Sequence, residues 1–299
     1  MIRSKKVLVT GGSGLVGKAL IPALHAAGWN PIIASRRPID AQTIVWDPHR
    51  HRLDPNSLHD IEAVVHLSGE NIAGKRWNAP VKEIIRESRI ASTRLLVETI
   101  KSAELKPRTF ICASAIGIYG DTGTQVVDES APTGAGFLAD VCAEWEQTAL
   151  ELSGTSRVVC TRFGTILSAR GGALQKMLPP FRLGVGGPIG SGRQLMSWVS
   201  ITDVTRAILF ALRDEQLHGP VNVVSPSPCT NREFTKTLGK ILNRPTYFRL
   251  PRLAVSAIFG EMGETLLLGS CGVRPKRLLD AGFLFDHHDL ESALQSALS

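Results

Sequence analysis

The sequence predicts an α/β fold, in which a parallel sheet carries helices on both faces. Short β-branched runs alternate with longer stretches of helical spacing over most of the chain, and this alternation is typical of βαβ units. Hydrophobic residues make up 43% and charged residues 20% of the 299 residues, so disorder is excluded for most of the chain. Frequent Gly and Pro residues towards the C-terminal end indicate a small mixed lobe there.

Strands are expected where β-branched residues cluster, and helices where apolar residues recur every three or four positions. The run Lys6 to Thr10 is of the type that forms a strand buried on both faces. Further strands are predicted at 31–35, 61–67, 109–113, 156–162 and 220–224. Helices are predicted at 15–28, 80–103, 137–152 and 203–213.

The chain changes character after Gly164, where Gly and Pro become frequent. The stretch 171–196 is too long for a plain turn inside a compact domain, so a functional loop that faces a cleft is expected there. We expect a first domain at 1–224 and a small second domain at 225–299. The second domain is expected to cover the carboxyl ends of the strands, on the substrate side.

A glycine-rich segment, TGGSGLVG, follows the first strand and opens the first helix. Gly11 allows a tight turn, Gly14 lets the backbone approach a pyrophosphate, and Gly17 lets the helix pack close to the strand. The anion would rest on free N–H groups at the helix N-terminus. This setting predicts a doubly wound, dinucleotide-binding sheet of the Rossmann type, rather than a glycine-rich turn without a ligand. The residues expected to bind the cofactor here are Thr10, Gly11, Gly12, Ser13, Gly14, Leu15, Val16 and Gly17.

The end of the second strand indicates which dinucleotide binds. An NAD site places a carboxylate there for the ribose 2′-OH, but this chain has Ser35, Arg36 and Arg37 and no acidic residue. A guanidinium matches a phosphate, and the Ser35 hydroxyl adds a donor. We therefore expect NADP(H), with Ser35 and Arg36 on the 2′-phosphate. The plainer interpretation is a pair of surface arginines before a proline.

The formal net charge of +7 needs a cause. The basic residues are scattered, and no zinc-finger spacing or aromatic RNA-binding motif accompanies them, so no nucleic-acid partner is expected. A site for an anionic small molecule accounts for part of the charge, and a solvated basic surface is the alternative. No apolar run is long enough to span a membrane, so no membrane partner is expected either.

The chain has five Cys residues in no CxxC spacing, and its His residues show no metal-ligand spacing, so no metal site is expected. An odd number of cysteines in mostly apolar surroundings favours buried free thiols in a reducing cytoplasm. The N-terminal residues lead directly into a strand, without the apolar segment of a signal peptide.

Other segments carry a family resemblance. His66-Leu67-Ser68-Gly69 and Ile118-Tyr119-Gly120 join the glycine motif in resembling the extended short-chain dehydrogenase/reductases. More specific are GENI at 69–72, RIAST at 89–93, GVGGPIGSG at 184–192, WVSITD at 198–203 and RPKRL at 274–278. These are similar to an atypical branch, the "epimerase family" proteins, which are NAD-dependent epimerase/dehydratase-like and carry a short C-terminal domain of unknown function. The resemblance covers essentially the whole chain.

The resemblance implies cofactor contacts beyond the glycine loop. They lie after the third strand, on the two long helices and after a later strand, at Leu67, Ser68, Gly69, Glu83, Arg89, Glu146 and Arg162. By the same resemblance, Arg162 lies near the nicotinamide end. For Glu83, Arg89 and Glu146 the plainer interpretation is ordinary charge on a helix surface. The resemblance also implies a homodimer formed through the helices at 80–103 and 137–152.

The chain departs from the family in its catalytic residues. Typical members use Tyr-x-x-x-Lys, in which the Tyr transfers a proton and the Lys lowers its pKa. Neither of the two tyrosines, Tyr119 and Tyr247, has a lysine four residues later. Leu138 stands where the Tyr is expected and Cys142 where the Lys is expected, while the supporting Ser or Thr falls on Ala115. The usual pairing of hydride and proton transfer is therefore in doubt.

The catalytic residues cannot be assigned from the sequence. The weak candidates are Tyr119, Ser114, beside Ala115, and Cys142. For each of them, a hydrogen bond that shapes a loop is the favoured role. The same holds for three further polar residues near predicted strand ends or loops, Glu70, Ser200 and Asp203.

Two functions from different classes follow. The first is an NADP(H)-dependent oxidoreductase or nucleotide-sugar-epimerase-like enzyme, with a small substrate held between the two domains. The second is a non-catalytic NADP(H)-binding regulator or partner protein, for example one related to cell division. The missing Tyr and Lys favour the regulator, while the long Gly- and Pro-rich segment and the second lobe favour the enzyme. A degenerate domain without a ligand is disfavoured by Arg36 and the intact glycines.

Overall fold

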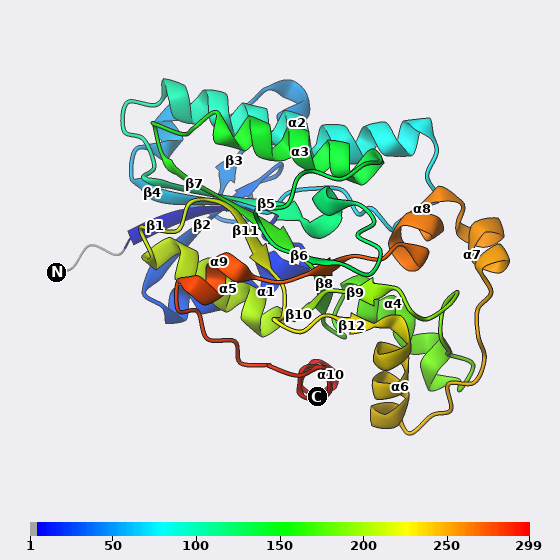
Figure 1. Cartoon of the computed structure of the whole chain (residues 1–299). Coiled ribbons are helices and arrows are strands. Elements are labelled where there is room, and N and C mark those ends of the chain that lie inside the picture. Colours follow the sequence, from blue (N-terminus) through cyan, green and yellow to red (C-terminus); the bar gives the residue numbers. More distant parts are fainter. Residues whose placement is uncertain (1–4) are drawn as a thin grey trace.

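A computed structural model describes residues 5–299. Among these residues, seven strands form one parallel sheet in the order β11-β7-β5-β4-β1-β2-β3 (Figure 1). The strands are β1 (Lys5–Thr10), β2 (Trp29–Ser35), β3 (Ile44–Val45), β4 (Ile61–His66), β5 (Thr109–Ala115), β7 (Arg157–Phe163) and β11 (Gly219–Val223). The chain runs outward from β1 to β2 and β3, then crosses to β4 on the other side of β1. This switch point opens a crevice at the carboxyl ends of β1 and β4.

Helices cover both faces of the sheet, as predicted (Figure 1). One face carries α2 (Ala79–Ser102) and α3 (Phe137–Leu150), and the other carries α1 (Leu15–Ala26) and α5 (Ile201–Arg213). Strand β1 shows why the sheet needs both layers. Its Leu8 packs into the core with α2 and α3, whereas Val7 and Val9 pack into the core with α1 and α5. The predicted α/β doubly wound fold is therefore confirmed.

The stretch 171–196 is not one long loop, and that expectation was wrong. Residues Gly172–Arg182 form a helix, α4. Leu174, Leu178 and Phe181 recur at helical spacing and are buried in a small separate core. The free energy gained by burying that face outweighs the cost of the backbone N–H groups that Pro179 and Pro180 lack. This cost is limited because both prolines lie towards the end of the helix. Irregular backbone is confined to the segment between α4 and β9 (Leu195–Met196).

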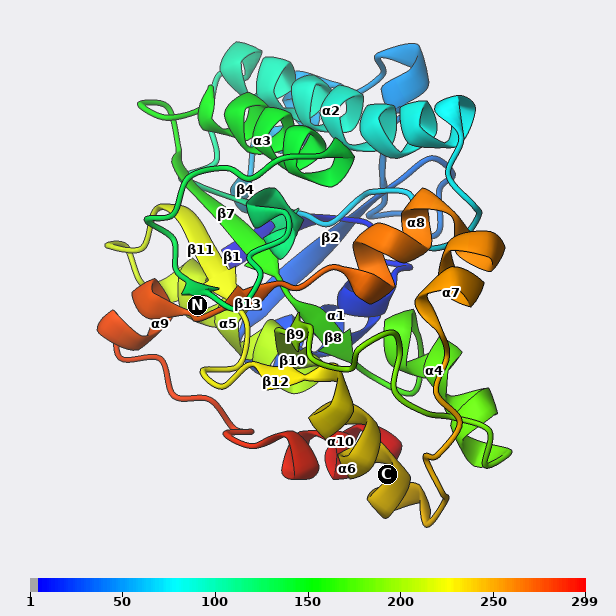
Figure 2. The ribbon, with the colours of Figure 1, turned by 45° about the vertical axis from the view of Figure 1, so that its right-hand side comes forward.

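The C-terminal part is built from short elements beside the sheet (Figure 2). They are β12 (Cys229–Thr230), α6 (Asn231–Leu242), α7 (Arg252–Phe259), α8 (Glu261–Gly263), the π-helix η4 (Glu264–Leu268), β13 (Gly272–Val273), α9 (Lys276–Asp280) and α10 (Leu290–Leu298). Short elements within the preceding part complete the fold: η1 (Pro48–Arg50), η2 (Pro55–Leu58), η3 (Ile116–Tyr119), β6 (Val126–Val127), β8 (Thr165–Leu167) and β10 (Trp198–Ser200).

The end of the chain does not stay in the lobe. Leu278, Phe283 and Phe285 are buried in the same core as α1 and α5. The tail then crosses to α10, which packs beside α6. The expected cap over the carboxyl ends of the strands therefore holds for only part of 225–299. Burial of the large Phe283 and Phe285 side chains removes more apolar area from water than a path of the tail along the surface would. This burial favours the return of the tail to the main core.

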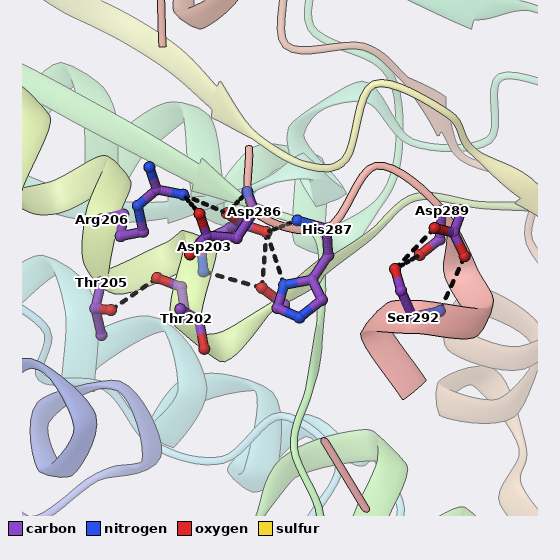
Figure 3. A network of polar contacts seen from close by, with 9 residues as sticks. Thr202, Asp203, Thr205, Arg206, Asp286, His287, Asp289 and Ser292 are labelled. Atoms are coloured by element: carbon purple, nitrogen blue, oxygen red, sulfur yellow. Dashed lines mark hydrogen bonds and ion pairs between the residues drawn. The ribbon is translucent and has the colours of Figure 1, made fainter. Parts of the chain in front are cut away.

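A buried carboxylate fixes this return (Figure 3). Asp203, in the first turn of α5, accepts hydrogen bonds from the backbone N–H of Asp286 at 2.7 Å and from the Ser200 hydroxyl at 2.8 Å. Arg206 lies 3.5 Å from Asp203 and also pairs with Asp286. His287 Nδ1 lies 3.5 Å from the other carboxylate oxygen. The buried charge is thus matched by donors from both ends of the contact.

The described residues hold no helix that is long and apolar enough to cross a membrane. Within the same residues, no group of three or more His, Cys, Asp or Glu side chains is arranged to hold a metal ion. The five cysteines are free, and all are buried except the partly buried Cys271.

Candidate functional site

A cavity of about 290 Å³ lies at the carboxyl ends of β1, β4 and β5, at the switch point of the sheet. One end is formed by the glycine loop and the other by α3. It brings together many of the predicted residues, namely Gly11, Gly14, Leu15, Val16, Gly17, Leu67, Ser68, Gly69, Arg89, Ser114 and Cys142. Its remaining walls come from Ile72, Ala113, Ala115, Gly117, Leu138, Val141, Trp145, Phe163 and Ile166.

The glycine loop is packed too tightly for side chains at two positions. Gly11 has φ of +68°, and a Cβ on it would lie 2.7 Å from the carbonyl carbon of Leu67. A Cβ on Gly17 would lie 2.4 Å from the carbonyl oxygen of Gly11. The loop is therefore drawn against β4 and α1 in the way that a close approach of backbone to ligand requires.

The N-terminus of α1 is left open towards this cavity. Gly14 is its N-cap residue, which makes no side-chain cap hydrogen bond, and the first turn has no acidic side chain. The first N–H groups of a helix have no acceptor within the helix, and the helix dipole adds positive character there. These groups fit the pyrophosphate of a dinucleotide. Ser13 is exposed beside them and Gly12 is buried behind the loop.

Thr10 supports the loop from behind instead of facing the cavity. Its side chain is fully buried, lies 2.7 Å from His66 Nδ1 and accepts a hydrogen bond from the Leu67 N–H at 3.1 Å. His66 Nε2 lies 3.0 Å from the hydroxyl of Thr93 on α2. Burial, with a smaller effect of the nearby Arg89 charge, lowers the pKa of His66 from 6.5 to about 3. A neutral imidazole therefore ties β1, β4 and α2 together.

Arg89 places a permanent cation beside the Leu67–Gly69 loop. Its guanidinium donates to the carbonyl oxygens of Glu70 at 3.0 Å and Ile85 at 2.9 Å and lies over the Trp145 ring at 5.3 Å. A guanidinium does not lose its proton in proteins. The plainer interpretation of Arg89 as ordinary surface charge is therefore wrong, because the side chain lines the cavity.

Ser35 and Arg36 lie at the carboxyl end of β2, apart from the cavity lining. The Ser35 hydroxyl accepts the Arg37 N–H at 3.4 Å. Arg36 is exposed and makes no hydrogen bond or ion pair with any residue from 5 to 299. Because β2 is next to β1 in the sheet, this guanidinium stands at the same edge as the glycine loop.

Glu83 does not join the cavity. It is exposed on α2 and lies 3.7 Å from Arg86, one turn along the same helix. The plainer interpretation, helix-surface charge, agrees with this position.

Four predicted residues and Asn222 form a buried network behind the cavity. Arg162 lies inside β7, one residue before the strand ends, and it donates to both oxygens of Glu146, at 2.8 and 2.7 Å. It also donates at 2.7 Å to the hydroxyl of Tyr119, which in turn donates to Asn222 Oδ1 at 2.7 Å. Ser114 completes the network by donating to Glu146 at 2.6 Å. Only Ser114 of these five residues lines the cavity.

Cys142 and Leu138, which the resemblance aligns with the family's Lys and Tyr, both lie on α3. Both line the cavity from α3, and both lie against Gly117, where a Cβ would be 3.4 Å from Leu138 Cβ and 3.9 Å from the Cys142 sulfur. Burial, with a smaller effect of the Glu146 carboxylate, raises the pKa of the Cys142 thiol to about 12. The thiol therefore keeps its proton at neutral pH.

Sequence reasoning missed Asn222 and the apolar wall. Asn222 is fully buried inside the run Pro-Val-Asn-Val-Val, and a polar residue within such a strand is a usable signal of a buried partner. Phe163 and Ile166 gave no such signal, because apolar residues at strand ends are common. Trp145 lies next to Glu146, and its indole N–H donates to Thr93 at 2.8 Å.

The comparisons with known proteins agree with this arrangement. Residues 7–224 match the model of the NAD dependent epimerase/dehydratase family, and residues 250–297 match a domain of unknown function (DUF1731). An "Epimerase family protein" of Mycobacterium bovis is 44% identical over 292 residues, which cover 96% of each chain.

Two solved structures place these matches in three dimensions. The human epimerase family protein SDR39U1, crystallised with NADPH, is 34% identical, has a TM-score of 0.90 and is matched over 98% of this chain and 99% of its own. A nucleoside-diphosphate sugar epimerase from Corynebacterium glutamicum is 33% identical with a TM-score of 0.80, over 98% of this chain and 58% of that one.

Proposed function

Since this chain belongs to the NAD dependent epimerase/dehydratase family, we propose that it is an NADP(H)-dependent oxidoreductase that acts on a small molecule. The observation that carries the proposal is the continuity of the cavity. It begins at the open N-terminus of α1 and continues to Ser114 and Cys142 without a break in its lining. A dinucleotide with its phosphates on α1 would place its nicotinamide at the Ser114 end.

The choice of NADP(H) over NAD(H) depends on Arg36. This guanidinium is exposed and unpaired among residues 5–299, at the end of the strand beside β1. A free guanidinium next to a hydroxyl suits a phosphate and offers nothing specific to a ribose 2′-OH. The human relative crystallised with NADPH supports the same choice.

When bound, NADPH supplies a hydride at its nicotinamide ring. The tasks left to the residues of this chain are to bind and orient the cofactor and the substrate and to exclude water from the reacting atoms. The α1 N-terminus binds the pyrophosphate, and the Arg89 cation adds positive charge at the Leu67–Gly69 loop. Met262 and Leu266 of the lobe pack on the cluster that contains Leu138, and this adds apolar cover beside the expected nicotinamide end.

Fluorescence titration with NADPH and NADH tests the cofactor assignment. Wild-type protein should bind NADPH more tightly than NADH. Arg36→Gln should weaken NADPH binding by about 10- to 100-fold, the equivalent of about 1.5–3 kcal/mol for a charge-assisted hydrogen bond, and leave NADH binding unchanged. The matched control is Arg37→Gln, which removes a neighbouring exposed charge. Equal effects of the two substitutions would overturn the role of Arg36.

A non-catalytic NADP(H)-binding regulator is the second candidate. The observation that favours it is the cavity lining, which contains no carboxylate, imidazole, amine or phenol among the described residues. The two candidates separate in one measurement. An enzyme oxidises bound NADPH when a suitable acceptor is added. A regulator binds NADPH with the same affinity, but the bound NADPH is not oxidised whichever acceptor is added. Both candidate functions are consistent with a reducing cytoplasm, which the free cysteine thiols favour.

A further inference from the structure

The cavity holds few groups that can donate or accept a proton. Among its described lining residues, Arg89 and Cys142 are the ones with an ionisable side chain, and Ser68 and Ser114 carry the hydroxyls. Arg89 is a permanent cation that already donates to two backbone carbonyls. The Cys142 thiol lines the cavity, is 4% exposed, and keeps its proton because burial raises its pKa to about 12.

The Ser114 hydroxyl is committed in one direction. Its proton points to Glu146 at 2.6 Å, and both oxygens of that carboxylate accept from Arg162. The guanidinium thus occupies both oxygens of Glu146 with charge-assisted hydrogen bonds. Ser114 therefore offers lone pairs to the cavity and has no relay behind it that would carry a proton.

Tyr119 is withdrawn from the site. Its phenol is 5% exposed, accepts from Arg162 and donates to Asn222, so both hydrogen-bonding roles are filled away from the cavity. Leu138 occupies the place where the family's catalytic phenol is expected. The Tyr119 phenol instead joins β7 to β11 through Arg162 and Asn222.

The walls near Ser114 are apolar and partly aromatic. Leu138 and Val141 come from α3, Ile166 from β8 and Phe163 from the end of β7. Such walls favour a ring over a polyhydroxylated sugar, since each sugar hydroxyl would lose its hydrogen bonds to water on entering.

From these observations we infer that the substrate is a small, flat, electron-poor ring of the quinone class, and that water supplies the proton its reduction requires. The inference rests on the proposed function. An isolated carbonyl that takes up a hydride becomes an alkoxide, about as basic as hydroxide, which forms at a useful rate only when an acid protonates the oxygen during the transfer. A quinone becomes a phenolate-type anion, whose conjugate acid has a pKa of about 10, like a tyrosine side chain. Only the second anion is stable enough to form without an acid from the protein, so its proton can come from water after the hydride transfer.

The step balances without a further reactant. A quinone gains two electrons and one hydrogen as a hydride, and a proton from water completes the hydroquinone. One C–H bond of the dihydronicotinamide breaks, and the electrons come from NADPH, which is oxidised to NADP⁺. The chain's own residues bind and orient the ring, and none of them changes its protonation state.

The full-length protein with NADPH should be offered three acceptors: menadione as a naphthoquinone, benzaldehyde as an isolated carbonyl, and a 4-keto nucleotide sugar. Loss of NADPH absorbance should be at least about 100-fold faster with menadione than with benzaldehyde, because general acid catalysis contributes about that factor. The rate with menadione should not vary with pH between about 6 and 9. A bell-shaped profile, or a preference for benzaldehyde, would overturn the inference and leave the proposed function intact. Oxidation with none of the three would instead overturn the proposed function.

A second variant and a binding measurement keep the test independent of turnover. The double variant Leu138→Tyr with Cys142→Lys restores the family's motif and should raise the rate with benzaldehyde by about 10-fold or more. Menadione added to the NADP⁺-loaded wild type should quench tryptophan fluorescence, since Trp145 lines the cavity, and Trp145→Phe should lose most of that quenching. Unaltered fluorescence of the wild type would contradict a ring bound in this cavity, even if the double variant fails to fold.

Discussion

The two halves of the cavity rest on different buried supports. Behind the glycine loop is a neutral network, in which His66 joins Thr10 to Thr93. Behind the Ser114 end is a charged one, in which Arg162 and Glu146 form an ion pair with both side chains less than 10% exposed. A neutral network fixes geometry with little dependence on its surroundings, whereas a buried ion pair is stable only while both partners remain. The half with the glycine loop is therefore expected to lose less stability than the Ser114 half when one partner of its support is removed.

The largest effect is expected from Glu146→Gln, which removes the charge that balances buried Arg162. The free energy of unfolding should fall by about 3–5 kcal/mol, as it does when one partner of a buried pair is removed. Urea unfolding measures this fall. Glu144→Gln is a matched control on the same helix, because Glu144 pairs with the partly exposed Arg86 and should cost about 1 kcal/mol or less. Equal losses of unfolding free energy in the two variants would contradict the conclusion that the buried pair of Arg162 and Glu146 contributes more to stability than the partly exposed pair of Arg86 and Glu144.

A second substitution tests the half with the glycine loop. Gly17→Ala places a methyl group against the Gly11 carbonyl oxygen, 2.4 Å away, so the loop must move off α1. NADPH affinity should fall by about 100-fold, the equivalent of about 3 kcal/mol, while far-ultraviolet circular dichroism stays unchanged. Ser13→Ala changes an exposed side chain in the same loop and keeps its backbone N–H, so it should have little effect. Undiminished binding by Gly17→Ala would contradict the placement of the pyrophosphate.

The neutral support should appear in the pH dependence of stability. His66 has a pKa of about 3 in the folded protein and 6.5 in the unfolded chain, so below pH 6.5 the unfolded state takes up a proton that the folded state does not. The contribution of His66 to the free energy of unfolding is therefore fully present above about pH 6.5. It falls as the pH decreases towards 3, by about 2 kcal/mol at pH 5. Urea midpoints at pH 7.5 and 5 measure this loss. His66→Gln should lack that share of the pH dependence, and an unaltered slope would exclude His66 as its source.

The smallest effect is expected at Cys142. Because burial raises the pKa of this thiol to about 12, it carries no charge near neutral pH, and Cys142→Ala should change NADPH affinity by less than about threefold. Iodoacetamide should label Cys142 only after unfolding in urea, since the thiolate is the reactive form. Rapid labelling of the native protein that NADPH blocks would show instead a reactive thiol in the cavity.

The sequence was informative wherever a local pattern determines the structure. A short β-branched run predicted β1, helical spacing predicted α1, and the glycines between them predicted the open helix N-terminus. The placement of Leu138 and Cys142 needed the family resemblance as well, because their positions were counted along one predicted helix from Trp145 and Glu146.

What the sequence could not supply depends on contacts between distant residues. Tyr119 is held by Asn222, 103 positions later, and no spacing rule links them. Arg162 looked like a residue at a strand end, and only its ion pair with Glu146 explains a guanidinium inside a strand. For α4, the prolines argued for a loop, and the core that outweighs them includes Phe234 and Leu294 from much later in the chain.

The return of the tail to α5 has a mechanical consequence. The C-terminal part is held to the sheet domain at several places besides the chain leaving β11. Asp203 holds Asp286 and His287, β13 pairs with β6, and Arg277 donates to the carbonyl oxygen of Pro220 in β11. A segment fastened at several points cannot swing away as one rigid body, so we expect a bound molecule to be released by local movements around the cavity and not by opening of the whole C-terminal part.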